Sequence, residues 1–264
     1  MEIMNPGIVA GQPPCSNDTT LGINASMNQC PMHQKLRPGL PELLPNIAKL
    51  PVDERGYPVP FFVQWLTEDR KAALPGAPEA RPDFRVMDGK KWERCYRERL
   101  CWVCGQPRPH KSTFVIGPMC AINRTSSECP SHYECAVWSV QACPFLVRPH
   151  MVRREDELTE ACQDNVAGNA IRRNPGVSLL WTSVNYKVFN AGNGYLFNVG
   201  DPKAVEWWRE GRRASRAEIM EAIESGLPRL REACNQEQPR DRISAHNDLT
   251  QKLDRVVKEL LPTV

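Results

Sequence analysis

Long hydrophobic runs are missing from this sequence. No stretch approaches the roughly 20 apolar residues that a membrane-spanning helix needs. The first residues, MEIMNPGIVAGQPPC, also lack the basic segment followed by an apolar segment that is typical of a secretion signal. We therefore expect a cytoplasmic protein that does not insert into a membrane.

Several enzyme signatures are missing as well. The sequence contains no internal repeat, no glycine-rich phosphate-binding loop and no HExxH motif. These absences argue against nucleotide-hydrolysing enzymes of the P-loop type and against zinc proteases built on HExxH. What remains is a chain of 264 residues that is 41% hydrophobic and 25% charged, a balance typical of globular proteins.

Cysteine and proline are abundant. The 24 prolines indicate that much of the chain forms loops. The 11 cysteines would suggest disulfides in a secreted protein, but in a reducing compartment clustered cysteines more often bind metal. The spacing of the cysteines therefore decides between the two.

The pattern along the chain predicts three regions. Residues 1–45 are rich in Pro, Asn, Ser and Gly and are expected to form a disordered N-terminal arm. Residues 46–234 are expected to form an α+β zinc-binding domain, with the zinc finger at 100–145. Residues 235–264 contain apolar residues at intervals of three and four, which predicts a C-terminal amphipathic helix. That helix is expected to dock on the body of the protein or on a protein partner.

Local patterns predict the elements of this domain. We expect strands within 59–66, 83–86, 174–184, 186–190 and 195–199, and a hairpin over 112–122 around Gly117–Pro118. A type I′ turn at Asn193–Gly194 is expected to join the last two strands. The fold class expected from these elements is α+β, a treble-clef zinc finger embedded in a small antiparallel sheet packed with helices.

Helix starts are predicted from capping residues. Asp88 is expected to cap a helix over 90–100, and Ser131 with Glu134 a helix over 132–142. Asp201–Pro202 predicts the start of a helix that contains Trp207 and Trp208. Ser215 with Glu218 predicts a further helix that ends at Gly226.

Two short motifs have the spacing of metal ligands. CWVCG places Cys101 and Cys104 in a tight turn, and HYEC places His132 and Cys135 on one face of a helix. Three thiolates and one imidazole suit tetrahedral Zn²⁺, and a site filled by four protein ligands is normally structural. The sequence therefore predicts one structural zinc site. Cys129 and Cys120 are alternatives to His132, and a set of buried free cysteines is the plainer interpretation.

Positive charge is concentrated around these motifs. Residues 85–154 contain 12 Lys or Arg against 5 Asp or Glu, a balance of +7, whereas the rest of the chain has 22 against 26, a balance of −4. Such a segment favours polyanions, so DNA or RNA is the expected partner, although a solvated charged surface explains the charge equally well. The candidate nucleic-acid-binding residues are Arg108, Lys111, Arg124, Arg148, Arg153 and Arg154.

Longer motifs carry a resemblance over about residues 50–235. GYPVPFFVQW, CWVCG, FVIGPMC, PSHYEC, ACPFLVRPHMVRR, NPGV, EWWREGR and RAEIMEAIESGLPRLREA together resemble a family of uncharacterised bacterial and phage proteins built around this cysteine cluster. The resemblance implies zinc binding and supplies no activity and no catalytic residues.

Three functions are compatible with these observations. The first is a non-enzymatic zinc protein that binds nucleic acid or regulates a partner. The second is a metal-dependent nuclease of the HNH kind, which needs a water-activating His and a further metal ligand, for which His110 and Asn123 are the nearby candidates. The third is thiol redox chemistry at Cys101 and Cys104, against which the HxxC motif argues. We expect binding rather than catalysis.

Overall fold

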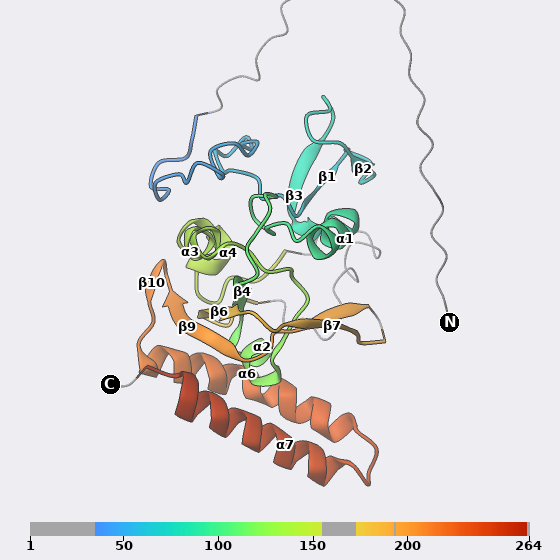
Figure 1. The fold of residues 1–264 in the computed structure, drawn as a ribbon, viewed down its shortest axis with the longest axis vertical. Helices are drawn as coiled ribbons and strands as arrows, with labels where there is room; N and C mark the ends of the chain where they lie inside the picture. The colour runs from blue at the N-terminus through green and yellow to red at the C-terminus, as the bar shows by residue number, and fades with distance from the viewer. Residues whose placement is uncertain (1–34, 155–172, 193, 263–264) are drawn as a thin grey trace, which may run out of the picture. The chain divides into compact units, whose positions relative to one another are not determined.

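Helices and small antiparallel sheets make up the part of the chain that can be described. The computed structural model describes residues 35–154, 173–192 and 194–262, in which three short sheets are combined with helices (Figure 1). The expected mixed α+β class is confirmed in this form. Within these ranges no helix is both long enough and apolar enough to cross a membrane.

The first sheet and the first helix are formed by neighbouring segments of the sequence. The sheet has the order β2-β1-β3, formed by Ala72–Ala73, Val63–Leu66 and Arg81–Met87. Helix α1 follows at Gly89–Arg97. Oδ1 of Asp88 accepts hydrogen bonds from the backbone N–H groups of Lys90 and Lys91, at 2.9 and 3.2 Å. The predicted cap is confirmed, because these two amides have no partner inside the helix.

A four-stranded antiparallel sheet forms the centre. Its order is β10-β9-β6-β4, with β4 at Ser112–Ile116, β6 at Ser178–Ser183, β9 at Pro202–Arg209 and β10 at Arg212–Arg213. All of β6 is buried. Successive side chains of a strand face opposite sides, so both faces of this sheet must be covered.

Helices cover the two faces. Helices α3 (Tyr133–Ala142) and α4 (Pro144–Val147) lie on the face where Leu180 and Trp208 are buried. On the other face α2 (Pro118–Asn123), α6 (Arg216–Gln236) and α7 (Arg242–Arg255) pack around Leu179 and Trp181. Figure 1 shows α6 and α7 side by side as a helical pair.

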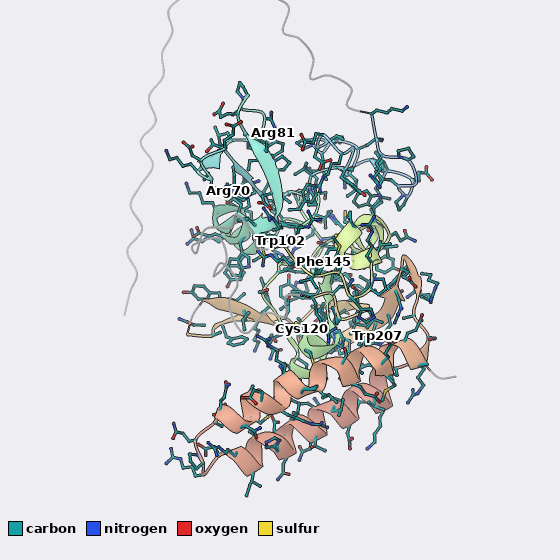
Figure 2. All side chains as sticks on the ribbon, turned by 180° about the vertical axis from the view of Figure 1, so that it is seen from behind. Arg70, Arg81, Trp102, Cys120, Phe145 and Trp207 are labelled. Atoms are coloured by element: carbon teal, nitrogen blue, oxygen red, sulfur yellow. The ribbon has the colours of Figure 1, made fainter. Side chains whose placement is uncertain are left out.

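The end of the helical pair is tied to the sheet. A π-helical turn, Val256–Leu260, follows α7. The indole Nε1 of Trp207 donates a hydrogen bond to the Leu260 carbonyl at 2.9 Å, and Figure 2 shows Trp207 where the sheet meets the helices. Leu249, Val256 and Leu260 are buried in the same core. The apolar side of the predicted C-terminal helix therefore packs inside this chain.

A third sheet has the order β5-β8-β7, formed by Thr125–Ser126, Tyr195–Asn198 and Lys187–Asn190. The fully buried ring of Phe197 joins this sheet to the core through Trp92 and Phe114, at centroid distances of 5.5 Å each. Strands β7 and β8 were predicted, whereas β5 was not; Asn193 of the predicted type I′ turn lies outside the described residues.

The predicted hairpin over 112–122 is wrong in its second half. Residues Pro118–Asn123 form α2. Pro118 has the fixed φ of a helix start and needs no N–H partner there, while Arg124 ends the helix in the left-handed conformation at φ 54°. A short apolar run fits the periodicity of a strand as well as that of a helix. Burial of Met119 and Ile122 against the core then favours the helix.

The predicted helix after Asp201 is also wrong. Pro202 begins strand β9, which pairs with β6 from Ser183↔Pro202 to Ser178↔Trp208. Proline is tolerated at the first residue of a strand, so Asp-Pro does not identify a helix start. Trp207 and Trp208 consequently pack on opposite faces of the sheet.

Capping motifs gave one correct and one incorrect prediction. Ser215 and Glu218 form the predicted capping box of α6. Ser131 does not cap α3; its backbone pairs with Thr113, and His132 is the N-cap. Helix α6 does not end at Gly226 but continues to Gln236. A Cβ on Gly226 would lie 2.8 Å from Met119 Sδ, so this glycine allows α2 and α6 to approach closely.

The segment from residue 35 to residue 50 packs on the body of the protein. Ile47 is fully buried, and Leu40, Leu43 and Leu44 pack against the same apolar cluster. The described part of the expected arm, residues 35–45, therefore packs on the body of the protein, because its leucines supply apolar surface that a composition rich in Pro and Gly obscures. Residues 1–34 of the expected arm lie outside the described residues.

Candidate metal centre

The first half of the candidate metal centre is a tight turn. The Gly105 N–H donates to the Cys101 carbonyl at 2.8 Å, and the Cys101 N–H donates to the Gln106 carbonyl at 2.8 Å. Gly105 has φ +70°, and a Cβ there would lie 2.7 Å from the ring of Phe61. Only glycine meets both conditions without strain, and the turn directs the Cys101 and Cys104 side chains to one side.

The second half lies at the start of α3. His132 is the N-cap residue, and its side chain makes no capping hydrogen bond. Cys135 follows in the first turn and is buried. Both side chains are therefore available to the CxxC turn, and the positive end of the helix dipole favours anionic sulfur at this position.

All four predicted ligand residues meet. Their ligand atoms lie within 4.8 Å of one another. His132 Nδ1 is 3.4 Å from Cys104 Sγ and 3.8 Å from Cys135 Sγ. Three sulfur donors and one nitrogen donor at these separations could hold a single metal ion. Elsewhere in the described part of the chain no other group of three or more His, Cys, Asp or Glu side chains gathers in this way.

The orientation of the His132 ring is fixed from outside the cluster. Its Nε2 lies 2.9 Å from the Pro107 carbonyl oxygen, which can only accept a hydrogen bond. This contact places the ring proton on Nε2 and leaves the lone pair of Nδ1 directed at the sulfur atoms. Metal-binding histidines are commonly held in this manner, because the outer hydrogen bond selects the tautomer that binds the ion.

Backbone amides favour negative charge on Cys101. The N–H groups of Cys104 and His132 point at Cys101 Sγ, at 3.5 and 3.4 Å. Burial alone would raise the pKa of Cys101, but hydrogen bonds from the Cys104 and Cys135 thiols and from the Cys104 backbone outweigh it and hold this pKa far below its usual range. Hydrogen bonds with Cys101 and Cys104 raise the pKa of Cys135. The cluster is thus prepared to stabilise thiolate, the form that binds metal.

An apolar shell surrounds the cluster. Val103 and Trp138 are buried beside it, together with Ile47 and the leucines that precede it. Hydrophobic surroundings limit solvent access to metal ligands. The segment from residue 35 to residue 50, although remote in sequence from the ligands, therefore helps to enclose them.

The two alternative ligands lie elsewhere. Cys129 Sγ donates to the Trp92 carbonyl at 3.6 Å, and Cys129 hydrogen bonds to Cys95. Cys120 lies on α2, where burial raises the pKa of its thiol to about 11. Neither residue belongs to the four-ligand group.

The predicted nucleic-acid-binding residues do not form one surface. Arg108 is 6% exposed, with Nε donating to the Leu100 carbonyl and Nη1 to Ser112 Oγ and the Tyr186 hydroxyl. This guanidinium has a structural role, because it supplies hydrogen-bond partners for polar groups that are buried in the core. Composition could not reveal this, since an arginine with several internal partners has no sequence signature.

The other five candidates differ in their surroundings. Lys111, Arg148 and Arg154 are exposed. Arg124 Nη1 pairs with Asp201 Oδ1 at 2.7 Å. Arg153 is half-buried, and its Nη2 donates to the Arg85 carbonyl. Arg153 and Arg154 line a cavity that sequence patterns did not predict.

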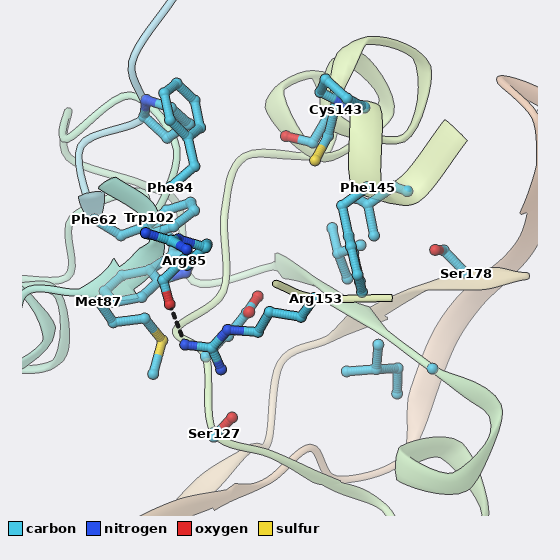
Figure 3. Close-up of a pocket in the computed structure, with 18 of the residues that line it drawn as sticks. Phe62, Phe84, Arg85, Met87, Trp102, Ser127, Cys143, Phe145, Arg153 and Ser178 are labelled. Carbon is cyan, nitrogen blue, oxygen red and sulfur yellow. Dashed lines mark hydrogen bonds between the residues drawn. The ribbon is translucent and has the colours of Figure 1, made fainter. Parts of the chain in front are cut away.

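This cavity is large and rich in cationic side chains. Its volume is about 1800 Å³, and nine Arg or Lys against five Asp or Glu line it, a balance of +4. Trp102 and Val103, which lie between the first two ligands, and Ser131, which precedes the third, are part of its wall. The candidate metal centre therefore lies next to one wall of the cavity. Figure 3 shows Phe62 and Trp102 at one wall and Phe145 at another.

An unusual carboxyl group lines the same cavity. Glu128 lines this cavity with an exposed side chain, and desolvation by the protein atoms around its carboxyl raises its pKa to about 7. A raised pKa favours the neutral form of this carboxyl, which repels anions less than a carboxylate does. The sequence around Glu128 did not predict this environment.

The residues required by the nuclease alternative are not paired with each other. Nδ1 of His110 lies 2.9 Å from Nη2 of Arg99. Asn123 ends α2 and lines the cavity. Among the described residues, His110 does not line this cavity.

Comparison with known proteins supplied no relatives: no protein-family profile, no curated protein and no solved structure matches this chain.

Proposed function

We propose that this protein is a non-enzymatic nucleic-acid-binding protein and that its four-residue cluster holds one structural Zn²⁺. The observation that carries the proposal is a set of four possible metal donors whose sequence neighbours Trp102, Val103 and Ser131 line a cation-rich cavity. Four protein ligands leave no position for a substrate, so the ion acts on structure. The charge balance of the cavity suits a polyanion.

The donor set favours Zn²⁺ over harder cations. Thiolate and imidazole are ligands that Zn²⁺ accepts, whereas Mg²⁺ and Ca²⁺ prefer oxygen. We also propose a treble-clef-like arrangement of a CxxC turn followed by a ligand-bearing helix. The backbone pairing of Thr113 with Ser131, at 2.9 and 2.8 Å, takes the place of the expected hairpin in supporting it.

Two further expectations belong to this proposal. Membership in the uncharacterised bacterial and phage family rests on the sequence motifs alone. A cytoplasmic location agrees with clustered thiols that bind metal, because reducing conditions keep them available. A protein partner at the C-terminal helix has no support from the fold, since Leu249, Val256 and Leu260 of its apolar side are buried.

Metal analysis tests the first half of the proposal. Full-length protein purified under reducing conditions should contain one Zn²⁺ per chain by elemental analysis. Cys104→Ser should lose the metal, whereas Cys234→Ser, which changes a half-buried cysteine on α6, should keep it. Equal metal content in the two variants would overturn the assignment of the site.

Binding to labelled nucleic acid tests the second half. Fluorescence anisotropy should show binding that weakens at least tenfold between about 50 and 200 mM salt, because phosphate contacts release counterions. The double variant Arg154→Glu with Arg229→Glu reverses two exposed charges at the cavity and should weaken binding strongly.

A matched variant controls for net charge. Arg231→Glu with Arg240→Glu makes the same change in charge at exposed residues that do not line the cavity, and it should bind almost as wild type does. Absent binding, or equal losses in the two double variants, would contradict the proposed site.

A further inference from the structure

The size of the cavity indicates the kind of ligand. Small-molecule pockets usually measure roughly 300–1,000 Å³. The cavity here, at about 1800 Å³, exceeds that range and joins several elements, from the first sheet to α6. A segment of a polymer fits this space better than a single metabolite does.

Aromatic rings are held rigidly at its walls. Phe62 is half-buried and stacks on Trp102, with ring centroids 5.0 Å apart and planes 13° from parallel. Phe145, also half-buried, comes from the short helix α4. Figure 3 shows the two phenylalanines on separate walls, with Arg153 reaching between them. Rigid rings of this kind are the surfaces on which nucleobases stack.

One hydrogen-bond donor of Arg153 has no partner among the described residues. Its Nη2 donates to the Arg85 carbonyl, which fixes the position of the guanidinium. Its Nε–H is buried and has no hydrogen-bond partner among the described residues. The rest of this half-buried side chain lines the cavity, where a phosphate oxygen can accept from a guanidinium edge.

A double helix cannot use these features together. In a duplex each base is stacked on its neighbours and paired, so its flat face is not available to a phenylalanine ring. Single strands expose that face, and aromatic side chains bind them with little regard for sequence.

We infer that the cavity takes a single-stranded segment of nucleic acid, with its bases stacked on Phe62 and Phe145 and its phosphates against Arg153 and Arg154. This inference rests on the proposed function and names its substrate class. Sequence readout is not required, because aromatic and cationic contacts are available to every base.

Competing oligonucleotides test the inference on the full-length zinc-loaded protein. Labelled oligothymidylate and oligouridylate of about 5, 10 and 15 nucleotides should bind at least tenfold more tightly than a duplex of the same length. Phe145→Leu, which keeps an apolar side chain and removes the aromatic ring, should weaken single-strand binding about tenfold and leave duplex binding unchanged.

Phe189→Leu is the matched control. Phe189 is 40% exposed on β7 and does not line the cavity, so its variant should bind as wild type does. Ultraviolet cross-linking of wild-type protein to 4-thiothymidine oligonucleotides gives a readout that does not depend on the folding of a variant. The cross-linked peptides should contain Phe62 or Phe145.

The outcomes separate the two proposals. Equal affinity for single strands and duplexes, or cross-links confined to peptides outside the cavity, would overturn the inference and leave the proposed function standing. Binding to neither probe would overturn the proposed function and the inference with it.

Discussion

Two groups of buried cysteines in this protein have opposite environments. The metal cluster and the pair Cys95–Cys129 both lie in the interior, with each sulfur-bearing residue at most 4% exposed. In the cluster, two backbone N–H groups point at Cys101 Sγ, and a histidine faces the sulfur atoms. In the pair, Cys129 donates to the Trp92 carbonyl, and burial and the neighbouring thiol raise its pKa.

The comparison indicates what distinguishes a thiol suited to metal binding from a packing thiol. Burial is common to both groups, so it does not explain the difference in the pKa of their thiols. The difference is the direction of the surrounding dipoles, because N–H donors stabilise a thiolate whereas a carbonyl oxygen stabilises the protonated thiol. Changes in each group should therefore have different consequences, which four measurements can check.

The largest effect is expected from Cys101→Ser. A structural zinc site of this type contributes an apparent free energy on the order of 10 kcal/mol, which is comparable to the whole stability of a domain. The variant should contain no zinc and should lose cooperative unfolding, as measured by elemental analysis and thermal denaturation. Wild-type protein treated with a strong chelator should behave likewise, and unchanged melting after complete zinc removal would refute a structural role.

The turn of the cluster is tested by Gly105→Ala. Positive φ and the approach of Phe61 should lower the free energy of unfolding by about 1–3 kcal/mol. Gly76→Ala is a matched control, because Gly76 has φ +86° with nothing within 4 Å of the added Cβ. Urea denaturation should show a larger loss for Gly105→Ala; equal losses would mean that the Phe61 contact contributes nothing.

Cys129→Ala tests the pair. Removing a buried sulfur should lower the free energy of unfolding by about 1–2 kcal/mol, because a small cavity remains. Zinc content should stay at one ion per chain. If elemental analysis instead found metal loss, the two groups of cysteines would not be independent.

The smallest effect concerns Glu128, the carboxyl group beside the pair. Its pKa of about 7 lies above its ordinary value of 4.5, so the folded protein retains a proton that the unfolded chain releases as the pH rises. Stability from this group is therefore complete below about pH 4.5 and is lost as the pH rises to about 7.

Because Glu128 is open to the cavity, the loss should be below about 1 kcal/mol. Urea denaturation at several pH values should show a shallower decline for Glu128→Gln than for wild type. Parallel profiles for the two proteins would show that this carboxyl has an ordinary pKa.

The candidate site could be predicted from sequence because its two halves are local. A CxxC turn needs only Gly105 and its neighbours, and His132 and Cys135 are three residues apart on a helix. The Asp88 cap and the Ser215–Glu218 capping box were found for the same reason. Each depends on hydrogen bonds that reach at most a few residues along the chain.

Elements decided by distant partners were predicted poorly. Asp201–Pro202 begins a strand because β6 lies beside it, and Gly117–Pro118 begins a helix because the core accepts Met119 and Ile122. A short apolar segment fits the periodicity of a helix as well as that of a strand, so contacts with segments distant in sequence decide which of the two forms. Arg108 was misplaced for a similar reason, since its partners include Tyr186, 78 residues away.

The sequence by itself determined the four candidate metal-binding residues, the mixed α+β composition and the positive segment, because these follow from residue types and short spacings. Only the tertiary structure decided which arginines are internal, where residues 35–50 pack, and that a cation-rich cavity lies against the metal cluster. The physical reason is that burial and cavity shape depend on which distant segments pack together, and this is a property of the whole fold rather than of any local stretch.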